Sequence, residues 1–258
     1  MIPHAGRLAP AIAAVLLLPA AVVSTSSAAT ASPVAANPAL EPFYTQQAQW
    51  EPCADRGPRV ECATVQVPLD YTDPSVRTLE LALLRVPSTG TPRGSLVVNP
   101  GGPGAGGMDF AEYLGGVIDP DVRNAFHIVG FDPRGVGASA PVQCLTGRQT
   151  TRWYRTDPTP DTVEERRTLW RRAAAISNGC LASDPQLARF VGTDNTVRDM
   201  DVIRSAVGDS TLNWLGFSYG TSLGARYAQE FPDTVGRMVL DGGVDPRLDA
   251  MAVSKDQS

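Results

Sequence analysis

Residues 211–230 read TLNWLGFSYGTSLGARYAQE, and this stretch decides the fold. Its first five residues are apolar and β-prone, so they predict a short buried strand. Residues 219–230 have helical spacing and predict a helix. Between the two lies Ser218, with Gly216 and Gly220 two positions to either side. This pattern is typical of a sharp strand-to-helix turn that exposes a nucleophilic serine, because only small residues fit beside such a turn.

The sequence supplies no histidine after Ser218. A serine hydroxyl is a poor nucleophile near neutral pH and needs a base, usually histidine, to accept its proton. The two histidines are His4, which lies in the expected targeting segment, and His127, which we expect to be an ordinary strand residue. We therefore expect the chain to carry a nucleophile without the base that activates it.

A glycine-rich loop follows a predicted strand at residues 95–98 and reads NPGGPGAGG over residues 99–107. Glycine lets a backbone N–H approach a substrate oxygen closely, so we expect the loop to supply one donor of an oxyanion hole. Gly102 is the favoured donor and Gly101 is a close alternative, while the N–H of Tyr219 is the expected second donor. A phosphate-binding loop is disfavoured, because no Gly-Lys-Ser/Thr follows.

A third element combines a predicted strand at residues 126–131 with a tight turn, DPRGVGAS, at residues 132–139. Asp132 and Arg134 are the charged residues of this turn. We expect both to brace the turn near the nucleophile rather than to take part in the chemistry.

The N-terminus predicts a secretory signal over residues 1–31. Arg7 supplies a positive charge, residues 9–23 form an apolar run, and residues 29–31 resemble an A-x-A cleavage site. The apolar run is shorter than a membrane span and a proline interrupts it, so we expect no stable membrane insertion. Residues 32–48 are then expected to form a flexible leader into the domain.

Four cysteines suit an exported protein. Among the three possible pairings we favour neighbours, Cys53 with Cys62 and Cys144 with Cys180. The cysteine and histidine spacing does not suit zinc, and we expect no metal and no cofactor. The net charge of -5 gives no reason to expect nucleic-acid binding. Arginine replaces lysine almost completely, which indicates a high-GC bacterial source.

The remaining segments alternate between strands and helices, which predicts an α/β fold with a mostly parallel sheet and flanking helices. Residues 61–69 and 77–86 alternate apolar and polar residues and predict an antiparallel start to this sheet. Further predicted elements are helices at residues 108–117, 160–177 and 196–207 and a last strand at residues 237–241.

Several motifs taken together resemble a known family, and they occur in that family's order and spacing. The motifs are Trp50-Glu51-Pro52-Cys53, Val67-Pro68-Leu69-Asp70-Tyr71, Asn99-Pro100-Gly101-Gly102-Pro103-Gly104, Asp132-Pro133-Arg134-Gly135-Val136-Gly137, Gly216-Phe217-Ser218-Tyr219-Gly220-Thr221 and Val239-Leu240-Asp241-Gly242. From about residue 50 to about residue 248, the chain is similar to the secreted α/β-hydrolases of the tripeptidyl aminopeptidase type, which are related to proline iminopeptidases.

The resemblance implies an α/β-hydrolase fold and a serine exopeptidase acting at the free N-terminus of peptides, with Ser218 as its nucleophile. It also implies that the acid, the base and a helical cap come later than this sequence reaches. Residues 49–258 would then be a hydrolase domain truncated before its last strands. Asp241 or Asp245 is a lesser candidate for the acid, because some α/β-hydrolases place it after this strand.

The sequence thus predicts a secreted bacterial serine peptidase that forms an acyl-enzyme on Ser218 and releases short peptides. We expect the 258 residues alone to be inactive. An esterase or lipase on the same fold is one alternative, because the serine and the loop serve both chemistries. A non-catalytic, truncated pseudoenzyme that binds peptides is another, because the base is absent.

Overall fold

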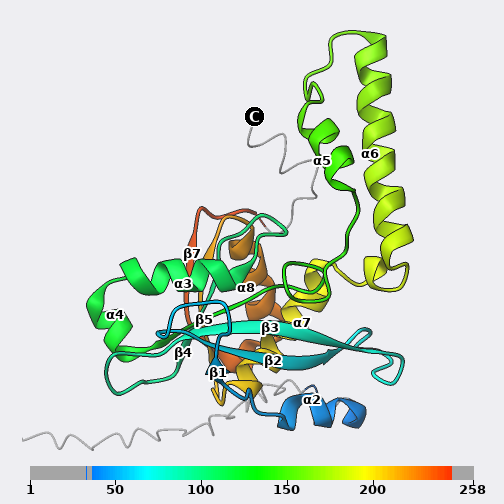
Figure 1. Ribbon diagram of the computed structural model, residues 1–258. Helices are drawn as coiled ribbons and strands as arrows, with labels where there is room; N and C mark the ends of the chain where they lie inside the picture. The colour runs from blue at the N-terminus through cyan, green and yellow to red at the C-terminus, as the bar shows by residue number, and fades with distance from the viewer. Residues whose placement is uncertain (1–32, 34–36, 246–258) are drawn as a thin grey trace, which may run out of the picture.

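The computed structural model describes residue 33 and residues 37–245 (Figure 1). The expected signal segment, residues 1–31, lies outside the described residues. In the part that is described, seven strands form one sheet in the order β1-β2-β3-β5-β4-β6-β7. The strands are β1 (Glu51–Pro52), β2 (Glu61–Pro68), β3 (Thr78–Val86), β4 (Ser95–Asn99), β5 (His127–Phe131), β6 (Leu212–Phe217) and β7 (Val235–Asp241).

The sheet begins with antiparallel strands and continues with parallel ones, as the sequence predicts. Strands β1, β2, β3 and β5 pair antiparallel, whereas β5, β4, β6 and β7 pair parallel. Asn99 at the end of β4 is in register with Gly216, and Asp241 at the end of β7 is in register with Phe217. The glycine loop, the serine turn and the turn after β5 therefore all leave the same edge of the sheet, where α/β proteins bind ligands.

Helices cover both faces of the sheet (Figure 1). Helix α3 (Gly107–Val117) packs on β3, β4 and β5, and α4 (Pro120–Ala125) leads from it into β5. On the other face, α7 (Thr193–Ala206) packs on β2, and α8 (Tyr219–Glu230) packs on β6 and β7. No helix in the described ranges is both long and apolar enough to cross a membrane.

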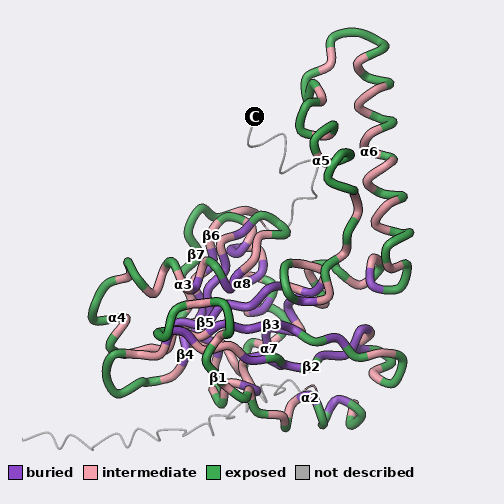
Figure 2. The backbone as a smooth tube through the Cα atoms, in the orientation of Figure 1, coloured by how far each residue is buried: buried purple, intermediate pink, exposed green. Residues whose placement is uncertain are grey.

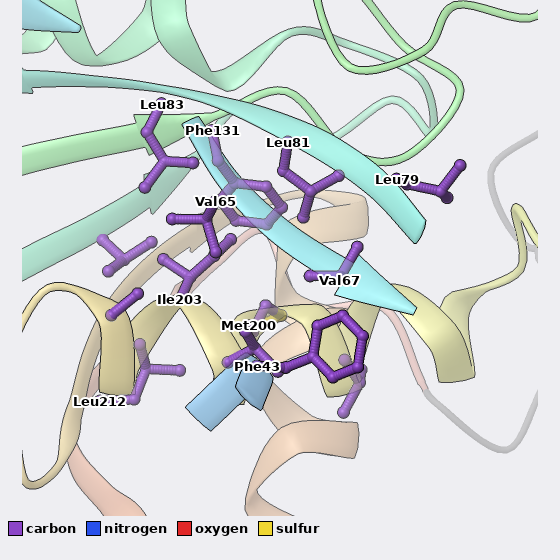
Figure 3. Close-up of a cluster of buried hydrophobic side chains, with 14 of the residues drawn as sticks. Phe43, Val65, Val67, Leu79, Leu81, Leu83, Phe131, Met200, Ile203 and Leu212 are labelled. Atoms are coloured by element: carbon purple, nitrogen blue, oxygen red, sulfur yellow. The ribbon is translucent and has the colours of Figure 1, made fainter. Parts of the chain in front are cut away.

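Alternation along β3 divides the core between these two layers. Leu79, Leu81 and Leu83 point toward α7 and belong to the larger buried cluster, whereas Leu84 and Val86 belong to the cluster beneath α3. Figure 3 shows the larger cluster, where side chains of β2, β3 and β5 meet those of the facing helices. On α7 the helical spacing supplies that face, with the buried residues Val197, Met200, Ile203 and Ala206.

The segment before the sheet differs from the flexible leader expected over residues 32–48. From residue 37 it forms a 3₁₀ turn, Pro38–Leu40, and helix α2, Glu41–Thr45, with Leu40 and Phe43 buried. The backbone N–H of Ala48 donates to Ala206 O at 2.8 Å, which joins the segment to the end of α7. The burial of these two large apolar side chains stabilises the segment in its folded form. The composition of the segment does not predict this, because it does not show which residues pack against other parts of the chain.

Helices α5 (Gly147–Tyr154) and α6 (Val163–Ser183) form a hairpin that projects from the body of the molecule (Figure 1). Neither of these described helices has a buried residue, and Figure 2 shows the hairpin as exposed or half-buried throughout. Helix α6 begins later than the predicted residue 160, because Thr162 caps it and forms a capping box with Glu165. Trp170, in the middle of α6, is 75% exposed.

Two disulfides join neighbouring cysteines, which is the pairing that the sequence favours. Cys53 bonds Cys62, at the start of β2. Cys144, just before α5, bonds Cys180, near the end of α6, and so closes the hairpin at its base.

Strand β7 is the last strand of the described sheet, and only β6 pairs with it. Val239 is 57% exposed and Leu240 is 41% exposed. Open backbone hydrogen-bonding groups beside exposed apolar side chains form a surface that pairs readily with other chains.

We therefore expect residues 32–258, expressed alone, to be poorly soluble. A charge on an edge strand opposes strand pairing, so Val239→Lys should raise the soluble fraction in a sedimentation assay. Val117→Lys, on an equally exposed valine of α3, is the matched control and should not. A soluble wild-type monomer with a sharp cooperative melt would contradict the expectation.

Candidate active site

Ser218 occupies a strained turn between β6 and α8. Its φ of 51° and ψ of -119° lie in the region that residues other than glycine rarely adopt. The backbone is held from both sides: its N–H donates to Asp241 O at 2.9 Å, and its carbonyl accepts Thr221 N–H at 2.9 Å and Thr221 Oγ1 at 2.6 Å. The residue is exposed at the edge of the sheet, as a nucleophile on such a turn must be.

Gly216 and Gly220 are required by a close approach across the turn. A Cβ atom on Gly216 would lie 2.3 Å from Gly220 O and 2.4 Å from Trp214 Nε1. The indole N–H of Trp214, which is fully buried, donates to the same Gly220 O at 3.0 Å. The first turn of α8 therefore rests directly on β6, with no space for a side chain between them.

The glycine loop packs against the serine turn. Gly101, with a φ of +102°, leaves so little space that a Cβ atom on it would lie 2.6 Å from Phe217 O and 3.0 Å from Ser218 Cβ. The side chain of Asn99, which is buried, accepts the Gly101 N–H at 2.9 Å. The sequence predicts no separate role for Asn99, although it is the first residue of the glycine-rich loop.

This arrangement bears on the choice of oxyanion donor. The N–H of Gly101 is occupied by Asn99 Oδ1, whereas the described residues offer no partner to the N–H of the exposed Gly102. Tyr219 is the first residue of α8, where backbone N–H groups have no partner within the helix. The geometry therefore favours Gly102 over Gly101 as the partner of Tyr219, and this assignment stays a prediction.

The side chain of Tyr219 ties the serine turn to α7. Its hydroxyl lies 2.7 Å from Thr193 Oγ1, on the first residue of that helix. Burial raises the pKa of Tyr219, so the phenol stays neutral. Tyr219 thus has a side chain fixed by the body of the protein and a backbone N–H free for a substrate.

Asp132 braces the turn that follows β5. It is buried, and its carboxylate accepts Met108 N–H at 3.2 Å and Ala138 N–H at 2.9 Å. One oxygen thus holds the start of α3, where the glycine loop ends, and the other holds the turn itself. No oxygen of Asp132 is directed at Ser218 by these bonds, so its role is structural.

Arg134 is fully buried and joins three parts of the chain. Its guanidinium donates to both carboxylate oxygens of Asp199 on α7, at 2.7 Å and 2.5 Å. It also donates to the carbonyls of Pro68 and Leu69 at the end of β2, and the hydroxyl of Tyr71 donates to Asp199 at 2.8 Å. All strong partners of Arg134 are thus inside the protein, and its charge is not available to a ligand.

His127 lies at the opposite edge of the sheet from Ser218. It is the first residue of β5, about 13 Å along the strand from the edge where Ser218 lies, at roughly 3.3 Å per residue. Its Nδ1 accepts Ser88 N–H at 3.1 Å, and burial with nearby Arg85 lowers the pKa of His127. His127 cannot act as the base for Ser218.

Asp241 contacts Ser218 through its backbone carbonyl, which accepts the Ser218 N–H, and Asp241 itself is exposed. Within the described residues, no histidine accompanies Asp241 or Asp245 at this edge of the sheet. In the same ranges, His, Cys, Asp and Glu do not group as metal ligands do. The described residues therefore bring a strained serine and two candidate oxyanion donors together without an acid–base pair.

Replacing Arg134 tests its structural role. Arg134→Met should lower the free energy of unfolding by about 3–5 kcal/mol, because it leaves Asp199 buried without a counter-charge. Arg226→Met breaks an exposed ion pair with Asp194 and should cost less than about 1 kcal/mol. Urea denaturation measures both, and similar costs for the two variants would refute the assignment.

Two glycines of the loop separate backbone strain from contact with the serine turn. Gly104→Ala should cost about 1–2 kcal/mol, because Gly104 has a φ of +92° but open space around it. Gly101→Ala should cost a further 1–3 kcal/mol or so, because its Cβ meets Phe217 O. Urea midpoints provide the comparison, and equal losses would show that the contact is relieved without cost.

The chain matches a family model described as the alpha/beta hydrolase fold over residues 94–257. Tripeptidyl aminopeptidase of Streptomyces lividans is 39% identical over 208 residues, which are 78% of this chain and 39% of that protein. Serine protease Hip1 of Mycobacterium tuberculosis (strain ATCC 25618 / H37Rv) is 38% identical over 234 residues, which are 84% and 44% of the two chains.

Carboxylesterase B of the same strain is 39% identical over 244 residues, covering 89% of this chain and 46% of that protein. The chain thus spans less than half the length of these relatives. Among solved structures, a proline iminopeptidase-related protein from Thermus thermophilus is similar at 21% identity and a TM-score of 0.38, covering 69% of this chain and 44% of that one. The fold predicted from the sequence is confirmed, and the chain belongs to the α/β-hydrolase family.

Proposed function

We propose that this chain carries the nucleophile of a secreted serine peptidase that removes short peptides from a free N-terminus. The observation that supports it best is the strained Ser218, held beside two backbone N–H groups, those of Gly102 and Tyr219. The peptidase assignment draws on the relatives named tripeptidyl aminopeptidase and serine protease, and so it is finer than the fold itself.

In the proposed reaction, Ser218 Oγ attacks the carbonyl carbon of the scissile peptide bond and its proton passes to a base. The carbonyl oxygen becomes an oxyanion, which accepts hydrogen bonds from the two N–H groups while the N-terminus of α8 favours its charge. The C–N bond then breaks, the amine leaves with the proton from the base, and the peptide stays as an ester on Ser218. A water molecule then gives its proton to the base and attacks the ester carbon. The peptide leaves as a carboxylic acid, and Ser218 Oγ regains its proton from the base.

The described residues offer no base to Ser218. The two histidines of the sequence are His4 and His127, and His127 lies at the wrong edge of the sheet. We infer that a histidine and an acid reach Ser218 from a part of the protein that relatives of about twice this length possess.

Export is part of the proposal. Residues 1–31 have the composition of a secretory signal, and the chain holds two disulfides, which persist in oxidising compartments.

An esterase is the second candidate, because Carboxylesterase B matches 89% of the chain. An ester and a peptide pass through the same tetrahedral intermediate, so the elbow and the loop do not distinguish them.

The test uses the protein translated from its gene through the native stop codon. We expect it to hydrolyse tripeptidyl arylamides faster than p-nitrophenyl esters, and Ser218→Ala should lower kcat by a factor of about 10⁵ or more. Ser222→Ala, four residues further along α8, is the control and should retain activity. Faster hydrolysis of the esters would favour the esterase.

The 258 residues alone provide the second arm of this test. Without a base we expect no more than trace turnover, of the size left when a triad member is removed. The inference about the base would be refuted if these residues turned over substrate at rates typical of enzymes and Ser218→Ala abolished that activity. Activity in the full gene product that survives Ser218→Ala would refute the proposed nucleophile.

A further inference from the structure

A cleft of about 370 Å³ opens beside Ser218, at the small end of the range for ligand sites. The glycine loop and Tyr219 form its side nearest the nucleophile. The turn after β5 and the base of the α5–α6 hairpin form the far side. Its apolar lining includes Val136, Val142, Ala188, Val191 and the disulfide between Cys144 and Cys180.

The cleft reaches the proposed oxyanion site at Tyr219. Gly101 and Tyr219 line it, Gly101 packs on Ser218 Cβ, and Tyr219 follows the nucleophile directly. A carbonyl whose oxygen lies between the N–H groups of Gly102 and Tyr219 therefore has one of its two substituents at the mouth of this cleft.

We take that substituent to be the acyl part of the substrate. The base that takes the serine proton also protonates the leaving group, so the leaving group must face the base. None of the described residues that line the cleft is an Asp, Glu, His or Lys, so the cleft provides no proton donor of this kind. The described wall of the cleft therefore favours the acyl residue there, with the leaving amine toward the base, and the substrate series below tests this orientation.

The cleft provides no charge for a ligand. Arg134 is its single charged lining residue among those described, and its guanidinium is consumed by Asp199 and backbone carbonyls. The hydroxyl of Thr196 lies 3.4 Å from Gly192 O, with which it bonds. A charged substrate side chain would lose its hydration here and gain no partner, which disfavours it strongly.

The apolar wall lies directly against the turn after β5, although Val191 is 41% exposed. Gly135, with a φ of +81°, lies so close to the wall that a Cβ atom on it would be 2.8 Å from Val191 Cγ1 and 3.3 Å from Val142 Cγ2. The Cys144–Cys180 bond fixes the other part of the wall covalently. Gly135 leaves no free space behind Val142 and Val191 on this side, so these two valines limit the size of a ligand in the cleft.

We propose that this cleft receives a neutral, apolar side chain of the acyl residue, the one whose carbonyl is attacked, and that Val142 and Val191 set its size limit. The proposal rests on the proposed function. It names the substrate class of that site: peptides with an aliphatic or aromatic residue immediately before the scissile bond.

The experiment compares kcat/KM of the full gene product on tripeptidyl arylamides that differ only in the residue before the scissile bond: Gly, Ala, Leu, Phe, Glu or Arg. We expect Leu or Phe to exceed Gly by about tenfold or more, and Glu and Arg to be the poorest. Val142→Phe and Val191→Phe should each reduce the Leu-to-Gly ratio about tenfold, because the added ring fills the space.

Two controls are matched in chemistry. Val163→Phe places the same ring on an exposed valine of α6 and should leave the Leu-to-Gly ratio unchanged. Cys144→Ala/Cys180→Ala should reduce this ratio by raising KM for the Leu substrate, whereas Cys53→Ala/Cys62→Ala, which removes the disulfide away from the cleft, should not.

An unchanged ratio in both phenylalanine variants, or equal turnover of Leu and Glu substrates, would overturn the proposal while leaving Ser218-dependent hydrolysis intact. If hydrolysis itself is absent, the proposed function fails, and the cleft is tested by binding. Calorimetric titration of the Ser218→Ala protein with Ala-Ala-Leu amide and Ala-Ala-Glu amide should then show binding of the first alone. Equal binding, or no binding, would overturn it.

Discussion

The structure depends on the close approach of two backbone segments at the carboxyl edge of the sheet. The ends of the neighbouring strands β4 and β6 lead into Gly101 and Ser218, and no side chain fits where the two meet. Asn99 stabilises one segment by accepting an N–H from its own loop, and Trp214 stabilises the other through Gly220 O. Hydrogen bonds on both sides of Ser218 therefore offset the conformational strain of its positive φ. Strained residues persist where the surrounding structure holds them in this way.

Around this contact two charged residues support the fold, and the candidate oxyanion donors are backbone N–H groups. The sequence predicts that Asp132 and Arg134 brace the turn after β5, and their hydrogen bonds hold α3, α7 and the end of β2 in position. A backbone oxyanion site requires such support, because N–H groups cannot be aimed unless the chain that carries them is fixed.

Local signals predicted the parts of the fold whose shape is decided locally. The strand, turn and helix around Ser218, the glycine loop and the alternation of β2 and β3 all followed from spacing and from glycine. The start of α6 did not follow, although the capping residues Thr162 and Glu165 mark it. The burial of Leu40 and Phe43 could not be predicted from the nearby sequence, because these side chains pack with those of α7, which lies far along the chain. The sequence could not decide between Gly101 and Gly102 as the candidate donor. The structure favours Gly102, because the Asn99 side chain already accepts the Gly101 N–H.

The disulfide at the foot of the α5–α6 hairpin has a topological consequence. The Cα atoms of Cys144 and Cys180 are 4.0 Å apart, so the chain leaves the body and returns to it at one point. Because the two ends of the hairpin lie side by side, the hairpin does not affect how the strands of the sheet are spaced. None of the described residues in its two helices is buried. Its length and sequence are therefore free to diverge among homologous chains without disturbing the nucleophile, as in an insertion at a surface loop. The hairpin is thus the part of this molecule in which evolution can change what the surface presents while the strands beneath it stay the same.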